Sequence, residues 1–179
     1  LIGFSVPGVS ARGRIGRLGP TLNTILAAHA YPPPVARLLG EALTLTALLG
    51  SMLRADEGQM TLQAQSHGAV VDLLVCDWRA GGLRGYLRHD PVKLARLGKR
   101  PSLHALMGTG YLAITLDQTS STESYQGIVP LEGGSLAEIA EHYFAQSEQL
   151  QSALFAIADM ASSDMDLGDM LRKMHAIVA

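Results

Sequence analysis

The chain has 179 residues and a formal net charge of −2, and 47% of its residues are hydrophobic although only 5% are aromatic. This composition predicts one main domain with a core of Leu, Ala, Val, Ile and Met, and it excludes a largely disordered chain. No apolar run approaches the ~18–20 residues of a membrane span, and no secretory leader is recognisable. We therefore expect a cytoplasmic protein without a membrane partner.

The first third of the chain predicts one strand and two helices. Ala11–Ile15 has the pattern of an edge strand. The next segment predicts a helix of about two turns, with Thr21 as its N-cap and the prolines from Pro32 as its end. Val35–Leu53 again has a helical pattern but is apolar almost all round, so we expect this helix to be buried or covered by another element.

Three strands are expected next. Apolar side chains alternate with Thr and Gln in residues 60–65, which is typical of a half-buried strand. Residues 70–76 form a nearly continuous apolar run, which favours burial on both faces, and residues 83–88 predict a third strand. Short turns separate the three segments, so the pattern predicts an antiparallel meander.

The following segment predicts a hairpin and a capped helix. Short helices are expected at residues 93–97 and 102–107, and residues 111–116 and 125–130 are expected to pair as strands. Ser135 stands three residues before Glu138, which is the spacing of a capping box at a helix start. The helix that follows carries one apolar stripe, made of Leu136, Ile139, Ala140, Tyr143 and Phe144. Together these elements predict an α+β fold in which an antiparallel β-sheet, built from the meander and the hairpin, packs against helices in a single main domain.

The pattern weakens towards the end of the chain. Residues 154–157 could begin a strand, and a helix is possible from Leu167, but the Met-, Ser- and Asp-rich segment between them has no clear period. We expect residues 1–157 to form the core domain and residues 158–179 to be a linker or tail.

The charges are unevenly distributed along the chain. Basic residues are concentrated between Arg79 and Arg100, whereas the segment from Asp117 to Asp169 is acidic without a counter-charge. The two segments could attract each other within one chain or across a dimer, or they could bind separate partners. The basic run leaves open a small nucleic-acid-binding module as an alternative function, although Trp78 and Tyr86 are too few aromatics for a stacking platform, so we expect nucleic acid not to be the partner.

No motif in the sequence predicts catalysis. The chain has no phosphate-binding loop, and it has neither the GxSxG motif of serine hydrolases nor the HExxH motif of zinc proteases. Its six histidines are scattered singly, and its one cysteine, Cys76, excludes an intrachain disulfide and a multi-cysteine metal site within these residues. Cys76 follows a buried strand, where a thiol usually behaves as a small apolar group. We expect no catalytic, cofactor-binding or metal-binding residue, and no enzyme.

Several motifs in a fixed order resemble the heat shock protein 33 family of redox-regulated chaperones. The clearest are Tyr125-Gln-Gly-Ile-Val129 and, after a glycine turn and a helix start, Tyr143-Phe144 followed by Ser147-Glu-Gln-Leu150. Earlier segments fit in register: Ala11-Arg-Gly13, Leu22–Leu26 before Tyr31-Pro32, Gly40-Glu-Ala-Leu43, Leu62-Gln-Ala-Gln65, Leu83-Arg-Gly-Tyr86 and Gly108–Thr115. The resemblance covers about residues 1–154 of the sequence.

The resemblance implies a cytoplasmic, ATP-independent holdase whose amino-terminal α+β domain binds unfolding client proteins and tends to form a homodimer. The family's switch is a carboxy-terminal module in which a Cys-x-Cys pair and a Cys-x-x-Cys pair hold zinc when reduced and form disulfide bonds when oxidised. None of these four cysteines is present, so zinc and disulfides are expected only if the full-length protein has that module. Of truncation and a naturally switchless variant, we expect truncation.

Adaptable apolar surface is what a client-binding protein needs, and the long apolar helix is the best candidate for it. The same pattern is also typical of an ordinary core helix. We expect clients to contact the side chains Leu43, Leu45, Leu49, Met52 and Leu53.

Overall fold

The computed structural model describes residues 1–6, 11–53, 58–118 and 124–147. Its strands are β1 (Ile2–Val6), β2 (Ala11–Ile15), β3 (Gly58–Ser66), β4 (Val71–Arg79), β5 (Gly82–His89), β6 (Gly110–Gln118) and β7 (Ser124–Pro130). Its helices are α1 (Gly19–Ala27), α2 (Pro33–Gly50), α3 (Pro91–Leu94), α4 (Leu103–Met107) and α5 (Leu136–Ser147). The expected strand at residues 154–157, the tail helix and the boundary at residue 157 lie outside the described residues.

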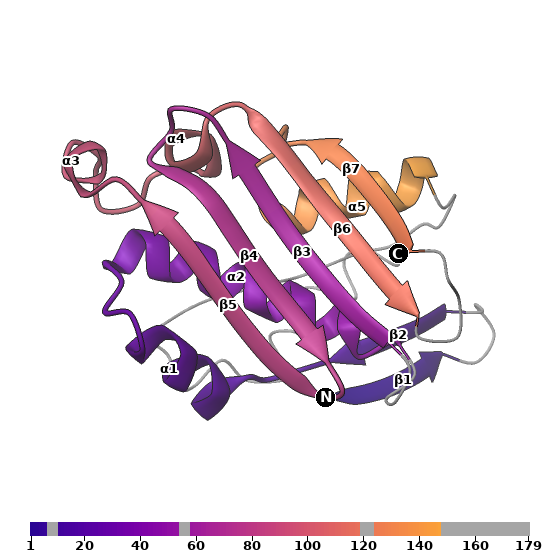
Figure 1. The fold of residues 1–179 in the computed structure, drawn as a ribbon. Helices are drawn as coiled ribbons and strands as arrows, with labels where there is room; N and C mark the ends of the chain where they lie inside the picture. The colour runs from indigo at the N-terminus through magenta and orange to yellow at the C-terminus, as the bar shows by residue number, and fades with distance from the viewer. Residues whose placement is uncertain (7–10, 54–57, 119–123, 148–179) are drawn as a thin grey trace.

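Five strands form one antiparallel sheet in the order β5-β4-β3-β6-β7 (Figure 1). The predicted meander (β3 to β5) and the predicted hairpin (β6 and β7) are confirmed. They are joined because β3 pairs with β6, so that Leu62 lies opposite Ile114. The strand expected at Ala11–Ile15 exists, but it pairs with β1 in a separate two-stranded sheet. The α+β fold class is therefore confirmed.

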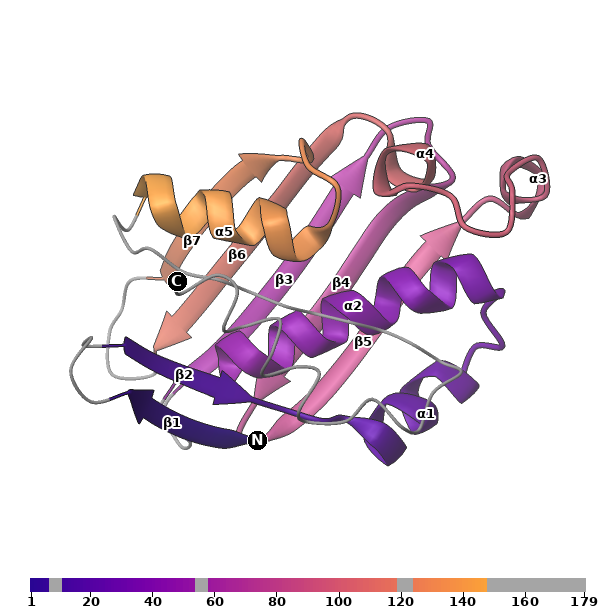
Figure 2. The ribbon, with the colours of Figure 1, turned by 180° about the vertical axis from the view of Figure 1, so that it is seen from behind.

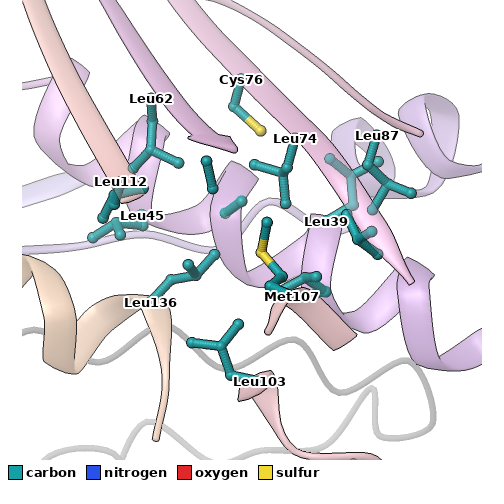
Figure 3. Packing of buried hydrophobic residues seen from close by; sticks show 14 of the residues in the cluster. Leu39, Leu45, Leu62, Leu74, Cys76, Leu87, Leu103, Met107, Leu112 and Leu136 are labelled. Atoms are coloured by element: carbon teal, nitrogen blue, oxygen red, sulfur yellow. The ribbon is translucent and has the colours of Figure 1, made fainter. Parts of the chain in front are cut away.

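The long helix α2 lies diagonally across one face of the five-stranded sheet, and α5 lies on the same face over β6 and β7 (Figure 2). The core between α2 and the sheet contains Leu39, Leu45, Leu62, Leu74 and Leu87, each with an exposed fraction of 1% or less (Figure 3). The helix approaches β5 closely at Gly85, where a Cβ atom would stand 2.7 Å from the side chain of Leu43. A helix that is apolar almost all round is therefore buried, as its pattern predicts.

Three helices have ends that differ from the predictions. Thr21 is not the N-cap of α1, because the helix starts two residues earlier at Gly19 and Leu18 precedes it without a side-chain capping bond. Pro20 lies in the first turn of that helix, where a proline is favoured because it has no N–H to leave unsatisfied. The helix α2 spans Pro33–Gly50 and not Val35–Leu53, because Pro33 and Pro34 form its first turn. The first of the short helices spans Pro91–Leu94, capped by Asp90, rather than residues 93–97.

One edge of the sheet, strand β5, carries an unusual contact. The hydroxyl of Tyr31, in the connection between α1 and α2, donates to the carbonyl oxygen of Leu87 at 3.1 Å and accepts from the amide of the same residue at 3.2 Å. Both backbone groups of Leu87 that point away from β4 are thus satisfied by one side chain. Tyr31 also contacts the rings of His29 and His89.

Candidate binding surface

The structure separates the five residues of the long apolar segment that we expect to bind clients. Leu43 and Leu45 are fully buried, and Leu49 has an exposed fraction of 7%. Leu53 lies just beyond the end of α2 and is partly buried against the core. Met52, in the turn after the helix, is 67% exposed. In this folded state only Met52 is freely accessible to another protein, and the other four serve as core. Whether clients contact this segment stays a prediction.

None of the helices that the structure describes lies over the other face of the sheet. The views from the two sides show α2, α4 and α5 behind the sheet in Figure 1 and in front of it in Figure 2, so that no described helix crosses the opposite face. We call this side of the sheet the open face. The prediction that residues 70–76 are buried on both faces is wrong in part: Leu74 and Cys76 point into the core, but Leu73 and Val75 point to the open face and are only half-buried.

A row of directly paired residues crosses the open face from one edge of the sheet to the other. In order from β7 to β5 it consists of Ile128, Ala113, Gln63, Val75 and Tyr86. We call these five residues the apolar row, since four of them are apolar; Ala113 is buried among its neighbours at 6% exposed, and Ile128, Val75 and Tyr86 are at least partly exposed. Ile128 is 60% exposed and Tyr86 is 44% exposed. Side chains paired in this way share one face of the sheet, so the row presents one continuous strip to a partner.

The surface beside Ile128 is hollowed. A shallow depression is lined by Gln63, Tyr111, Ala113, Gln126 and Ile128. Ala113 forms its floor, because the small side chain leaves room between larger neighbours on either side. The hydroxyl of Tyr111 donates to Gln65 Oε1 at 2.6 Å, which fixes the ring along one side of the depression. The arrangement offers an apolar floor with polar groups around it, as binding surfaces commonly do.

The row next to the apolar row is polar, and its members satisfy one another. Asp77 accepts from Thr61 Oγ1 at 2.6 Å with one carboxylate oxygen and from Arg84 Nε at 2.7 Å with the other. On the other side of β3, Gln126 Nε2 donates to Thr115 Oγ1 at 2.9 Å. These side chains need no partner to complete their hydrogen bonds. On this face it is therefore the apolar row that would gain most from contact with a partner, since removing apolar groups from water is favourable.

The basic run from Arg79 to Arg100 is partly neutralised by acids of the neighbouring strands. Arg84 pairs with Asp77, and Arg88 Nε lies 2.8 Å from Asp72 Oδ1, which lowers the pKa of that carboxyl. Lys93 lies 3.9 Å from Asp90 and donates to the carbonyl oxygen of Gly68. None of these acids belongs to the later acidic segment. A phosphate backbone would compete with these acids for Arg84, Arg88 and Lys93, and the described residues give no observation that favours the nucleic-acid alternative.

The described residues considered for metal or redox chemistry are not brought together. Cys76 is fully buried and free, and burial raises the pKa of its thiol far above the ordinary value, so the thiolate that reacts or binds metals is disfavoured. In the described part of the chain, no three His, Cys, Asp or Glu residues are placed so that they could hold a metal ion. No helix within the same residues is long and apolar enough to cross a membrane.

A buried carboxylate joins α2 to α5, and sequence reasoning missed it. Glu41 Oε1 accepts from the first amides of α5, from Leu136 at 2.8 Å and from Ala137 at 3.3 Å. Burial raises the pKa of Glu41, and the two amides only partly offset that effect. The capping box contributes the rest of the helix start: Ser135 Oγ accepts from the Glu138 amide at 3.1 Å, while the Glu138 carboxylate reaches back to Gly134 instead of Ser135. The sequence feature that could have indicated this link is Glu41 itself, an acidic residue in a helix that is otherwise almost entirely apolar.

Comparisons with known proteins agree with this architecture. The sequence model of the Hsp33 protein family matches residues 1–175. The chain is 46% identical to a 33 kDa chaperonin of Caulobacter vibrioides over 149 residues, which are 82% of this chain and 49% of the relative. It is 42% identical to the 33 kDa chaperonin of Ectopseudomonas mendocina, over 87% of this chain and 51% of the relative.

A solved structure is similar as well. The crystal structure of the 33 kDa chaperonin (heat shock protein 33 homolog) from Thermotoga maritima superimposes with a TM-score of 0.61 and 26% sequence identity, covering 74% of this chain and 45% of that one. The chain thus spans about half the length of the curated relatives it matches.

Proposed function

The chain belongs to the Hsp33 family, and on this basis we propose that it is the client-binding part of a redox-regulated, ATP-independent chaperone. Such a holdase binds unfolding proteins during heat or oxidative stress and prevents their aggregation. Its partners are unfolded or partially folded proteins, its compartment is the cytoplasm, and its action needs no catalytic residue. Hydrophobic burial between client and chaperone supplies the driving force.

One observation supports this proposal beyond the family match: the apolar row lies on a sheet face without a covering helix among the described residues. Ile128 and Tyr86 are the most exposed large apolar side chains of that face. Unfolding proteins have apolar segments of no particular sequence, and a strip of methyl groups and a ring can accept many of them. Met52 could add to the contact, as the one exposed residue of the five in and after α2.

An aggregation assay tests the proposal. Citrate synthase is heated with an excess of this chain, and aggregation is followed by light scattering. We expect the unmodified chain to suppress scattering and the double variant Ile128→Ser/Tyr86→Ser to lose most of that effect. Val92→Ser is the matched control, because Val92 is 63% exposed but lies on α3, away from the open face. Unchanged scattering with an excess of the unmodified chain would contradict the holdase function.

The redox switch belongs, in this proposal, to the remainder of the full-length protein. Four thiolates are needed to hold zinc in the way that the family does, and the single buried Cys76 does not fit that role. We therefore expect zinc and disulfide bonds only in a longer protein that has the carboxy-terminal module. Residues 158–179 would then lead from the core domain, residues 1–157, towards that module.

A homodimer is also part of the proposal. The chain's basic run and its later acidic segment could attract each other between two copies. Sedimentation at low and high salt would reveal a dimer of this kind, since screening weakens charge pairing between exposed groups.

A further inference from the structure

The helix α5 packs on a surface formed by α2, α4 and the strands β6 and β7, which we call the seat. Three features of the seat fit this helix. The first is apolar: Leu136, Ile139 and Ala140 have exposed fractions of 1% or less, and Leu136 lies among Leu45, Leu103 and Met107 in Figure 3. These side chains are spaced as i, i+3 and i+4 and face the sheet as one stripe. Seats of this kind accept amphipathic helices in many complexes.

The second feature is a socket for an aromatic ring at the position i+7. A Cβ atom at Gly127 of β7 would stand 2.2 Å from the ring of Tyr143, so this ring fits only because the strand has a glycine there. The hydroxyl of Tyr143 donates to the hydroxyl of Tyr125 at 2.6 Å. Tyr143 is 3% exposed. The strand β7 therefore accommodates both the ring of Tyr143, at Gly127, and its hydroxyl, at Tyr125.

The third feature is an acceptor for the start of the helix. The first amides of any helix have no partner within the helix, and Glu41 supplies one from α2. A carboxylate is also attracted by the positive end of the helix dipole. The distance along the chain from Leu136 to Tyr143 is two helical turns, so Glu41 and the Gly127 socket define both the direction and the length of the helix that fits.

One contact of α5, the one with Glu41, is weaker than the others. The carboxylate of Glu41 is partly buried beside α5; burial raises its pKa, and the two amides of α5 lower it. Among the described residues, no cation takes part in this contact. A partly buried charge without a cation weakens a contact relative to a neutral acceptor of the same shape. The surface under α5 is thus specific for this helix. The charge of Glu41 makes the contact weaker than the fit of the side chains alone would make it.

We propose that the seat formed by Glu41, Gly127 and Tyr125 is a binding site for amphipathic helices of other proteins, and that α5 is its intramolecular occupant. The partner has apolar residues at i, i+3 and i+4 and an aromatic residue at i+7, as α5 has. This inference rests on the proposed function and names one class of client segment, a helix from a partially folded protein. When α5 leaves, such a helix takes its place.

A labelled peptide with the sequence of residues 134–147 tests the site, in binding experiments with the complete 179-residue chain. Ile139→Ser weakens the resident helix without changing the seat. We expect this variant to bind the peptide at least about tenfold more tightly than the unmodified chain does, since the competent fraction of the seat rises. His142→Ser is the matched control, because His142 is exposed on α5.

Two further changes show where the peptide binds. Adding Gly127→Ala to Ile139→Ser fills the ring socket and should abolish the gain, and a peptide with Ser in place of Tyr143 should bind neither protein. Equal affinity for all chain variants, or a gain that survives Gly127→Ala, would overturn the inference. Circular dichroism verifies folding, and if Ile139→Ser does not fold, Ile139→Ala serves with an expected gain of about threefold.

The outcome separates the inference from the proposed function. Peptide binding without suppression of citrate synthase aggregation would contradict the holdase function and leave the helix site standing. Suppression of aggregation without peptide binding would remove the helix site alone.

Discussion

The two faces of the five-stranded sheet contain residues from the same strands but meet different surroundings. On the covered face, Leu62, Leu74 and Leu112 are fully buried beneath helices. On the open face, the apolar row lies beside a polar row whose side chains are bonded to one another. The comparison shows that apolar content alone does not separate core from surface, because Leu74 is fully buried whereas Val75, the next residue, is half-buried on the open face. What lies against each face decides the role.

The largest effect is expected from removing a core side chain of the covered face. Leu62→Ala should lower the free energy of unfolding by about 3 kcal/mol, because it removes buried methyl groups and leaves a cavity. The next residue along β3 points to the open face, and Gln63→Ala should change stability by less than about 0.5 kcal/mol. Urea unfolding measures both. Similar losses for the two variants would contradict the assignment of the faces.

A smaller but still clear effect is expected in β7. Gly127→Ala should lower the free energy of unfolding by about 2 kcal/mol, since its methyl group would occupy the space of the Tyr143 ring. Ile128→Ala, one residue further and on the open face, should have little effect on stability. Thermal unfolding followed by circular dichroism gives both values. A Gly127→Ala protein as stable as the unmodified chain would show that Tyr143 can move away without cost.

The smallest effect is expected from Glu41 and depends on pH. Burial raises the pKa of Glu41 above its ordinary value of 4.5, so the folded chain holds this proton more firmly than the unfolded chain does. The contribution of Glu41 to stability is therefore greatest at acidic pH and falls as the pH rises through the raised pKa. Glu41→Gln keeps an acceptor without the charge, and it should gain stability relative to the unmodified chain as the pH rises above about 4.5.

Urea unfolding between acidic and slightly alkaline pH measures this difference. Thr44→Ala, a neutral change on the same helix, should follow the pH profile of the unmodified chain. Parallel profiles for Glu41→Gln and the unmodified chain would show that Glu41 does not titrate in this range. Glu41→Ala should lower stability by about 1 kcal/mol, because the first amides of α5 lose their acceptor.

Local patterns were sufficient to predict most of the fold. Alternation in residues 60–65 and the capping box at Ser135 are properties of short segments, and the corresponding strand and helix start are present. Pairing between β3 and β6 joins residues about fifty positions apart, and no local pattern reports it. The predicted N-cap of α1 is wrong because Thr21 has a suitable side chain, whereas the helix starts at Gly19, with Pro20 in its first turn and no capping side chain.

The binding surface was harder to predict than the fold. Leu43 and Leu45 carry the same apolar character whether they contact a client or a sheet, and only the packing of α2 shows that they are core. Conversely, Val75 was interpreted as buried because its neighbours in sequence are apolar. The link from Glu41 to α5 spans 95 residues in sequence, so its partner could not be named before the chain was folded.

The tyrosine beside strand β5 has a consequence for the protein's own solubility. An uncovered strand edge is a template on which other chains extend a sheet, and this is how many aggregates grow. Tyr31 occupies both free backbone groups of Leu87, so an incoming strand finds no hydrogen-bond partner at that residue. A protein proposed to meet aggregating chains at high concentration needs such a seal. At Leu87, Tyr31 therefore blocks the backbone pairing by which another chain would extend this sheet.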